Sequence, residues 1–204
     1  MITNILTILI VVPSIMAFQN QQLFEQLKHY PYREKQTNEW YRWLTAGFIH
    51  GGWLHLLINA FVLYSFGQAV EAAYGAFFGD RGPVYFILLF VVSVVSANIK
   101  TYFTHQNNPG FSSIGASGGV SGVLFAYILF YPWEMVYLYG VIGIPGIIAA
   151  LGYLAYSQYM SKKGGDLIDH EAHLYGALAG LLLTILFGPM KVIPFFIERL
   201  TTFN

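Results

Sequence analysis

Apolar residues gather into six segments along this chain, and short polar, glycine or proline stretches separate them. The segments cover residues 5–23, 53–74, 83–99, 115–130, 135–156 and 173–187. About 20 apolar residues are needed for a helix to cross the hydrocarbon core of a bilayer. The pattern therefore predicts an all-α membrane protein with six membrane helices. The fourth and sixth segments are short, so we expect their ends to lie below the membrane surface, beside a water-filled cavity.

The regions that flank these segments carry their own signals. The first segment has no positively charged start, which favours a retained span over a cleaved signal sequence. We expect it to continue through polar residues 19–22 towards Leu27, with a kink at Pro13. Residues 28–52 are polar but rich in Trp and Tyr, which predicts a folded segment at the membrane interface. We expect residues 189–204 to lie on the membrane surface.

Composition narrows the class of protein further. The chain has 204 residues, of which 56% are hydrophobic and 10% are charged, whereas soluble domains carry roughly 25% charged residues. Ten basic and ten acidic side chains balance, so no electrostatic signal points to nucleic acid. Cysteine is absent, which excludes disulfides and thiolate catalysis. We expect one integral membrane domain over residues 1–204, and any nucleophile in it must be an oxygen.

Ser117 lies in Gly-Ala-Ser-Gly-Gly at residues 115–119, immediately before the fourth apolar segment. Serine is a common N-cap, and for a serine taken alone a cap is the more frequent role. The free N–H groups of the same helix start could also stabilise an oxyanion. The start of a short, glycine-rich membrane helix favours the second interpretation, in which Ser117 is a nucleophile.

His173 begins the sixth apolar segment and shares a helical face with Gly176 and Gly180. Gly118 and Gly122 have the same small-xxx-small spacing in the fourth segment, and such faces let membrane helices approach closely. A lone histidine in a core is more often structural. An ionisable residue inside a membrane is, however, a functional candidate by default, and His173 could act as general base towards Ser117.

Three polar residues around the second segment are further candidates. His55 and Asn59 are four residues apart on one helical face. They could donate hydrogen bonds to an oxyanion or simply join two helices, and the spacing leaves both open. His50 could fix the preceding loop or His55. A metal site is disfavoured because residues 170–173 read His-Glu-Ala-His rather than His-Glu-x-x-His, so we expect no metal and no cofactor.

Three charged residues are expected to be structural rather than catalytic. Glu71 follows the second segment and could cap or brace a loop, and Arg42 could do the same within residues 28–52. Asp169 precedes His173 by four residues and could orient its imidazole. A solvated loop carboxylate is the favoured role for Asp169.

Taken together, these motifs resemble those of the rhomboid family of intramembrane serine proteases. The resemblance rests on the Gly-x-Ser-Gly element at residues 115–118, the Ala-His-x-x-Gly element at 172–176 and the series His50, His55 and Asn59. Trp-Tyr-Arg at residues 40–42 is similar to the family's Trp-Arg signature, with Tyr41 where tryptophan is expected. The resemblance covers about residues 39–180 and implies the six-helix core without extra spans or a soluble domain. We expect the core of the rhomboid domain at about residues 39–187.

The resemblance implies roles for these residues. Ser117 and His173 would form a catalytic dyad without a third acid, and the Ser117 N–H, His55 and Asn59 would hold the oxyanion. Gly115 and Gly118 would shape the turn, and His50, Arg42 and Glu71 would support it. The first loop would lie half in the membrane, and the fifth helix with its following loop would gate substrate entry.

One departure from the family concerns Ser121, one turn after Ser117. Some members carry there an aromatic side chain that packs on the catalytic histidine, and a serine cannot do this. Orientation is a second point of tension, because most Lys and Arg residues fall on the side of the first loop and the positive-inside rule would place that loop in the cytoplasm. The family's active site faces away from the cytoplasm, and we follow the family.

The sequence therefore predicts an intramembrane serine endopeptidase with transmembrane proteins as substrates and the lipid bilayer as its surroundings. We expect a multi-pass protein of a bacterial inner membrane. The alternative is a catalytically inactive rhomboid-like protein that binds membrane helices. A channel or transporter that uses the buried His and Asn residues as a polar path is a third hypothesis.

Overall fold

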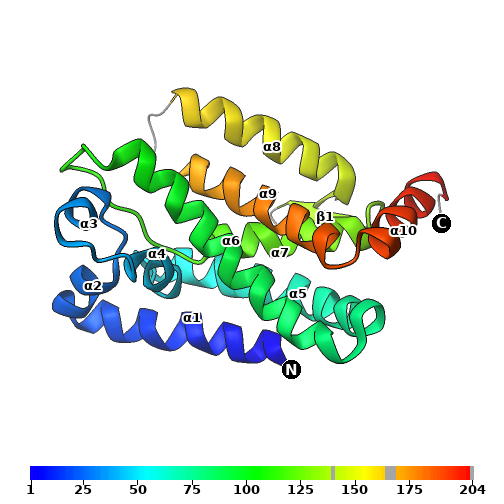
Figure 1. The fold of residues 1–204 in the computed structure, drawn as a ribbon, viewed down its shortest axis with the longest axis horizontal. Coiled ribbons are helices and arrows are strands. Elements are labelled where there is room, and N and C mark those ends of the chain that lie inside the picture. Colours follow the sequence, from blue (N-terminus) through cyan, green and yellow to red (C-terminus); the bar gives the residue numbers. More distant parts are fainter. Residues whose placement is uncertain (139–140, 164–168, 203–204) are drawn as a thin grey trace.

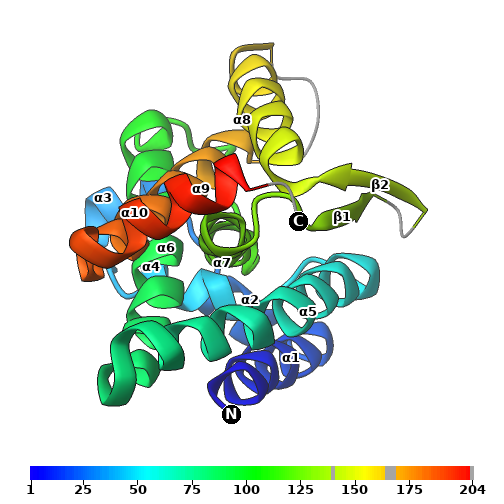
Figure 2. The ribbon, with the colours of Figure 1, turned by 90° about the vertical axis from the view of Figure 1, so that its right-hand side faces the viewer.

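The computed structural model describes residues 1–138, 141–163 and 169–202. Its long helices are α1 (Ile2–Gln19), α5 (Trp53–Phe78), α6 (Gly82–His105), α7 (Ser117–Phe130), α8 (Gly146–Lys163) and α9 (His170–Phe187). Figure 1 shows these helices as one bundle, and Figure 2 shows α7 end-on near its centre. Helix α7 packs against α5, α6 and α9, while α1 packs mainly against α5. The all-α bundle predicted from the sequence is thus observed, apart from one short sheet.

Three segments of the described ranges are long and apolar enough to cross a membrane: residues 2–19, residues 53–105, which comprise α5 and α6, and residues 170–187. Helix α7 is apolar but shorter. Eleven of its fourteen residues are buried, so it is the core helix rather than a lipid-facing one. The short fourth segment predicted from the sequence is therefore an inner helix surrounded by longer ones.

The first span is shorter than the sequence predicted. Helix α1 ends at Gln19, and a separate helix α2 (Gln21–Leu27) follows it. Asn20 has an extended backbone, and its side chain accepts a hydrogen bond from the Leu23 N–H (3.0 Å). Asparagine favours such N-cap positions over helix interiors, so the prediction of one continuous helix to Leu27 was wrong. Pro13 lies inside α1, as expected.

Residues 28–52 fold into short helical turns, namely α3 (Pro31–Thr37), α4 (Arg42–Thr45) and the 3₁₀ turn η1 (Ala46–Phe48). Aromatic side chains hold this loop on α6. The Trp40 and Trp43 rings lie 5.3 and 5.5 Å from the ring of Tyr102. Asn98 Nδ2 also donates to the Trp43 carbonyl (2.8 Å). The predicted folded loop is observed, and it covers one end of the bundle (Figure 1).

The second and third spans meet in a tight corner at the other end of the bundle. Helix α5 ends at Gly79, whose φ of +58° lies in the left-handed region that glycine adopts most readily. A 3₁₀ turn, η2 (Gly79–Arg81), leads directly into α6. This corner lets α5 and α6 run antiparallel with almost no linker.

The fifth apolar segment contradicts the sequence prediction over half its length. In this half, β1 (Met135–Leu138) and β2 (Ile142–Pro145) pair antiparallel as a β-hairpin, and α8 begins only at Gly146. An apolar run of this length is compatible with a strand or a helix. Pro145 disfavours helical backbone in the residue before it, which explains why α8 begins after the proline. Figure 2 shows the hairpin projecting from the bundle beside α8.

The chain ends in helix α10 (Pro189–Thr201), which follows α9 without a linker beyond Gly188. Val192 is its one buried residue, and Phe195 packs on Phe77 with ring centroids 4.8 Å apart. Met190 and Ile197 are exposed. This amphipathic pattern fits the surface position predicted for residues 189–204.

Candidate active site

Ser117 begins α7 well below the ends of the neighbouring helices. A Cβ added to Gly176 of α9 would lie 2.3 Å from the Gly118 carbonyl oxygen, and one added to Gly118 would lie 2.6 Å from Cβ of Ala97 on α6. Gly176 is six residues from the start of α9 and Ala97 is eight from the end of α6. At 1.5 Å per residue these are about 9 and 12 Å. The fourth helix therefore starts inside the bundle, as its length predicted.

The turn before Ser117 is held from outside α7. Gly115 has φ of +118°, a conformation unfavourable for other residues. Its N–H donates to the Ala46 carbonyl (2.9 Å), and the Ala116 N–H donates to His50 Nε2 (3.3 Å). Ala116, not Ser117, is the N-cap, and no side chain caps this helix. The interpretation of Ser117 as an N-cap was wrong, and its hydroxyl is not used in that way.

The backbone at the start of α7 presents hydrogen-bond donors. The Val120 N–H donates to the Ala116 carbonyl (2.9 Å) and closes the first turn. The N–H groups of the three preceding residues, 117–119, have no carbonyl one turn earlier in the helix. These donors and the partial positive charge of the helix start favour an anion beside Ser117.

His173 lies on the helix that approaches α7 most closely. The contact continues one turn further along, where a Cβ on Gly180 would lie 2.3 Å from Cα of Gly122. His173 precedes Gly176 by three residues and therefore shares its face of α9. The glycine faces predicted from the sequence do meet, and they place the helix that carries His173 against the start of α7.

An aromatic ring from α8 lies on His173. The rings of Tyr153 and His173 are nearly parallel, 11° apart, with centroids separated by 6.4 Å. The Tyr153 hydroxyl also makes a hydrogen bond of 2.7 Å with Ser121 Oγ. Ser121 thus holds an aromatic ring that comes from another helix.

Asp169 anchors the start of α9. Its carboxylate accepts hydrogen bonds from the Ala172 N–H (2.9 Å) and from Thr101 Oγ1 of α6 (2.8 Å). Its carbonyl accepts one from the His173 N–H (3.2 Å). Asp169 is therefore the N-cap of α9, not the solvated loop carboxylate that the sequence favoured.

His50 connects α1 to the turn before Ser117. Its ring is fully buried, and Nδ1 lies 2.8 Å from Ser14 Oγ of α1. Because Nε2 accepts from the Ala116 N–H, the neutral ring carries its proton on Nδ1. Burial, with a smaller contribution from nearby His55, lowers the pKa of His50 to about 3. His50 is thus a neutral support for the turn.

His55 reaches the same turn from α5, and Asn59 follows it one helical turn later. A Cβ on Gly115 would lie 2.8 Å from His55 Nε2, so the imidazole lies directly against this backbone. Asn59 is buried, and its Nδ2 donates to the His55 carbonyl (2.9 Å). An amide nitrogen has two N–H groups, so a second donor of Asn59 is available for another acceptor.

Two charged candidates lie away from the turn and join elements. Arg42 is buried and donates from Nη1 to the carbonyls of Glu25 and Lys28 (2.8 Å each). Glu71 accepts hydrogen bonds from the backbone N–H groups of Ile2 (2.6 Å) and Thr3 (2.9 Å). Arg42 braces the first loop, and Glu71 caps the first turn of α1.

A small cavity of about 20 Å³ lies beside Ser117, which is enough for one water molecule. Polar side chains in its wall are Asn98, Ser113, Ser117 and Asp169. Ser113 Oγ is buried without a hydrogen-bond partner, so a polar occupant is favoured. A much larger cavity, of about 410 Å³, lies elsewhere, between residues 77–85 and 187–191.

The sequence interpretation missed several residues of this arrangement. Tyr153, Ser14 and Thr101 each contact a candidate residue from another helix. Spacing rules relate residues on one helix and give no signal for such contacts. The one signal available in the sequence was that each of these three residues has a polar side chain within an apolar segment.

The fold and the site are those of a helical membrane protein in which a serine begins an inner helix, below the ends of the neighbouring helices. Comparison with known proteins gives the family. The family model described as Rhomboid domain matches residues 37–190, which is most of the chain. The chain belongs to the rhomboid family, and the resemblance stated from its motifs is confirmed.

Similar proteins come from bacteria and plants. The chain is 27% identical over 191 residues to Rhomboid protease GlpG of Haemophilus influenzae, covering 89% of this chain and 86% of that protein. It is 31% identical over 156 residues to Rhomboid-like protein 11, chloroplastic, of Arabidopsis thaliana, covering 71% of this chain but 51% of that protein. It is 28% identical over 153 residues to Rhomboid protease GluP of Bacillus subtilis, covering 75% and 27% respectively.

Proposed function

We propose that this chain is a serine endopeptidase that cleaves transmembrane proteins in or near their membrane segments. Rhomboid relatives named as proteases support intramembrane proteolysis. One observation carries the proposal for this chain. The start of α7, with Ser117, lies about 9 to 12 Å below the neighbouring helix ends, against the helix that bears His173.

In the proposed reaction, Ser117 Oγ attacks the carbonyl carbon of the scissile peptide bond while His173 takes the hydroxyl proton. The C–N bond then breaks, and His173 returns the proton to the leaving amine. Water next attacks the acyl-enzyme ester with His173 again as base, the bond between Ser117 Oγ and the acyl carbon breaks, and His173 returns the proton to Oγ. The polar cavity beside Ser117 has room for that water.

The oxyanion of each tetrahedral intermediate would lie at the start of α7. The Ser117 N–H would donate to it, as would His55, whose ring lies against Gly115, and Asn59, one helical turn after His55 on α5. Such fixed donors stabilise charge that develops only in the transition state. Gly115 and Gly118 allow the close approach of His55 and Ala97 that a side chain would prevent.

Substrate access would be controlled by α8. Three of its eighteen residues are buried, and several apolar side chains of its surface are exposed, including Ile148, Leu151 and Tyr159. A helix with so little buried surface separates from its neighbours at a low free-energy cost. The loop after α8, which the family resemblance also implicates, lies outside the described residues.

The placement in the membrane is part of the proposal. Helices α1, α5, α6, α7, α8 and α9 would be the six spans of one domain over residues 1–204, with the rhomboid core at about 39–187. The first loop would lie half in the membrane at the end nearer Ser117. That end would face away from the cytoplasm of a bacterial inner membrane.

A cleavage assay on single-span substrates in liposomes tests the dyad. Ser117→Ala and His173→Ala should each lower the cleavage rate by at least about 10³-fold, because the two residues act as one unit. Ser113→Ala is a matched control, since Ser113 lines the same cavity but is not assigned to the dyad. Undiminished cleavage by either dyad variant would refute the proposal.

A fluorophosphonate probe separates the protease from a rhomboid-like protein that only binds membrane helices. The probe should label the parent protein at Ser117 and leave Ser117→Ala unlabelled. Substrate helices retained without labelling or cleavage would favour the binding protein. Ion or solute flux that survives Ser117→Ala would favour a channel or transporter.

A further inference from the structure

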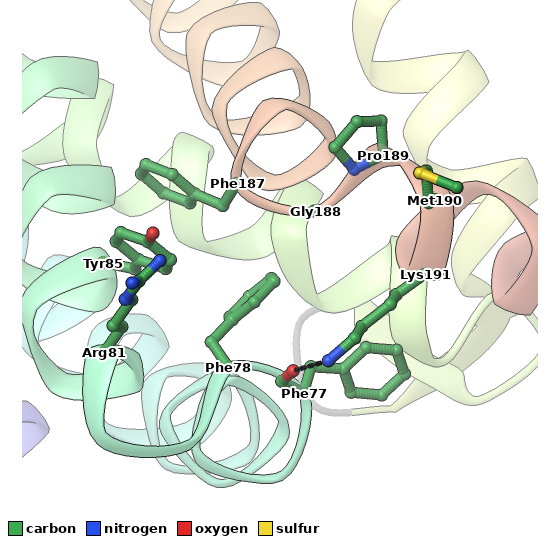
Figure 3. A pocket seen from close by; sticks show the side chains of 9 residues that line it. All are labelled: Phe77, Phe78, Arg81, Tyr85, Phe187, Gly188, Pro189, Met190 and Lys191. Atoms are coloured by element: carbon green, nitrogen blue, oxygen red, sulfur yellow. Dashed lines mark hydrogen bonds between the residues drawn. The ribbon is translucent and has the colours of Figure 1, made fainter.

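The end of the bundle remote from Ser117 carries the larger cavity, of about 410 Å³. It lies where the end of α5, the start of α6, the end of α9 and the start of α10 come together (Figure 3). Helix α5 alone spans 26 residues, or about 39 Å, between the His55 region and this end. The cavity is therefore separate from the proposed active site.

Aromatic rings form the wall of this cavity. Tyr85 and Phe187 are stacked, with centroids 4.2 Å apart and planes within 3°. Phe78 meets Tyr85 edge-on at 5.3 Å. A Cβ on Gly188 would lie 2.9 Å from Cε1 of Phe78, so the corner between α9 and α10 fits tightly on this ring. The wall is a preformed apolar surface.

Two cations border the aromatic wall. Figure 3 shows the side chains of Arg81 and Lys191 on either side of Phe78. Lys191 Nζ donates to the Phe77 carbonyl (3.2 Å), which leaves two of its three N–H groups for other acceptors. Neither cation forms an ion pair with a carboxylate in the described ranges. No carboxylate lines the cavity.

The ends of the apolar helices suggest a depth for this cavity, and we expect it to lie at the level of lipid headgroups. Residues 53–105 and 170–187 are apolar enough to cross a membrane, and the cavity surrounds the point where α5 and α9 end. Aromatic and basic side chains concentrate at this boundary between hydrocarbon and water. Met190, which also lines the cavity, is 91% exposed, as suits a side chain that contacts acyl chains.

We propose that this cavity binds one anionic phospholipid. The phosphate would lie between Arg81 and Lys191, with an acyl chain along Phe78, Tyr85 and Phe187. Guanidinium and ammonium groups both donate to phosphate oxygens. A lipid with net negative charge is favoured over a zwitterionic one because the site has two cations and no carboxylate. This binding does not depend on the chemistry proposed for Ser117.

Native mass spectrometry of the detergent-purified protein tests the site. Titration with phosphatidylglycerol should give tighter one-to-one binding than phosphatidylcholine with the same acyl chains. Each cation near a membrane surface contributes about 1 kcal/mol towards an anionic lipid, or about fivefold in affinity. The double variant Arg81→Gln/Lys191→Gln should therefore lose up to about 25-fold in affinity for phosphatidylglycerol and little for phosphatidylcholine.

Two further variants keep the test decisive. Lys162→Gln/Lys163→Gln removes the same charge from the end of α8 and should retain binding. Arg81→Lys/Lys191→Arg should also retain it, which excludes misfolding as the cause of a loss. Equal affinities for the two lipids, or an unchanged Arg81→Gln/Lys191→Gln variant, would overturn the proposal. Displacement of the lipid by millimolar inorganic phosphate would show a general anion site and would overturn it as well.

Discussion

The two sides of α7 are built differently. Towards α9, backbone meets backbone at Gly118 and Gly176 and again at Gly122 and Gly180. Towards α8, the contact consists of side chains, chiefly Phe125 and Ile128 against Ala150 and Tyr153. Eleven of fourteen residues are buried in α7, and three of eighteen in α8. The side towards α9 is suited to hold the proposed dyad in a fixed geometry, while on the other side α8 is suited to move away from α7.

The two sides of α7 carry different parts of the proposed site. Ser117 and His173 both belong to the glycine-packed side, where no side chain separates the helices. Tyr153 belongs to the other side, yet its ring lies on His173 and its hydroxyl contacts Ser121. A movement of α8 would therefore change the environment of His173 without moving α9. The position of the proposed gate and the orientation of the proposed base would be coupled through the Tyr153 ring.

The largest expected effect is that of a methyl group in the glycine-packed side. Gly180→Ala would place Cβ 2.3 Å from Gly122 Cα, and backbone atoms cannot rotate away, so the two helices must separate. Overpacking of this kind typically costs about 1–3 kcal/mol, and we expect the upper end. Thermal or denaturant unfolding in detergent micelles measures the change.

Gly152→Ala in α8 is the matched control, because its Cβ would meet nothing within 4 Å. Replacement of a glycine within a helix by alanine should stabilise it by about 0.5–1 kcal/mol. Equal destabilisation by the two substitutions would show that the packing of α7 against α9 is not tighter than the packing around α8.

The second prediction concerns the ring that connects the two sides. Tyr153→Leu removes the stack on His173, and we expect the cleavage rate to fall about tenfold, a loss of about 1.4 kcal/mol in the barrier. Tyr153→Phe keeps the ring and loses only the hydrogen bond to Ser121, so its effect should be smaller. Rates of Ser117 labelling by a fluorophosphonate measure the reactivity of the dyad apart from substrate entry.

A positioning role for Tyr153 requires that labelling and cleavage fall together. If Tyr153→Leu slowed cleavage while Ser117 labelling kept its parent rate, Tyr153 would act only at substrate entry. Phe125→Leu is a suitable control for the loss of packing between α7 and α8, because Phe125 belongs to the same contact and its ring lies 5.8 Å from that of Tyr153.

The sequence predicted the glycine-packed side better than the other. Small-xxx-small spacing and a histidine in register with it are local patterns, and they identified both α7 and α9. Helix α8 was predicted to begin at residue 135, because an apolar run does not distinguish strand from helix. The hairpin depends on hydrogen bonds between two separate strands, and the spacing of apolar residues along the chain does not indicate which residues pair.

Contacts between helices set the limit of prediction within the site. Residue type and the spacing within each separate segment were enough to select Ser117, His173, His55 and Asn59. Tyr153 and Thr101 act across segments, and no spacing connects them with His173 or Asp169. The N-cap role that was the alternative for Ser117 is not observed, because Ala116 is the cap and His50 and Ala46 hold the turn from outside the helix. Asn20, by contrast, was a readable local signal, since asparagine favours the N-cap position, which it occupies at the start of α2.

The last prediction tests a third side of α7, where His50 holds the start of the helix against α1. The folded-state pKa of His50 is about 3, below the ordinary 6.5. As pH falls from about 6.5 towards 3, the unfolded chain therefore binds a proton that the folded protein does not. Stability should decrease through this window, by up to about 2 kcal/mol at pH 5 for this one group. His50→Asn removes this one group and keeps every other histidine, so the melting temperature of the variant should fall less than that of the parent between pH 7.5 and pH 5. If the melting temperatures of the parent and of His50→Asn fell by the same amount, His50 would not be the buried neutral support that connects α1 to the turn before Ser117.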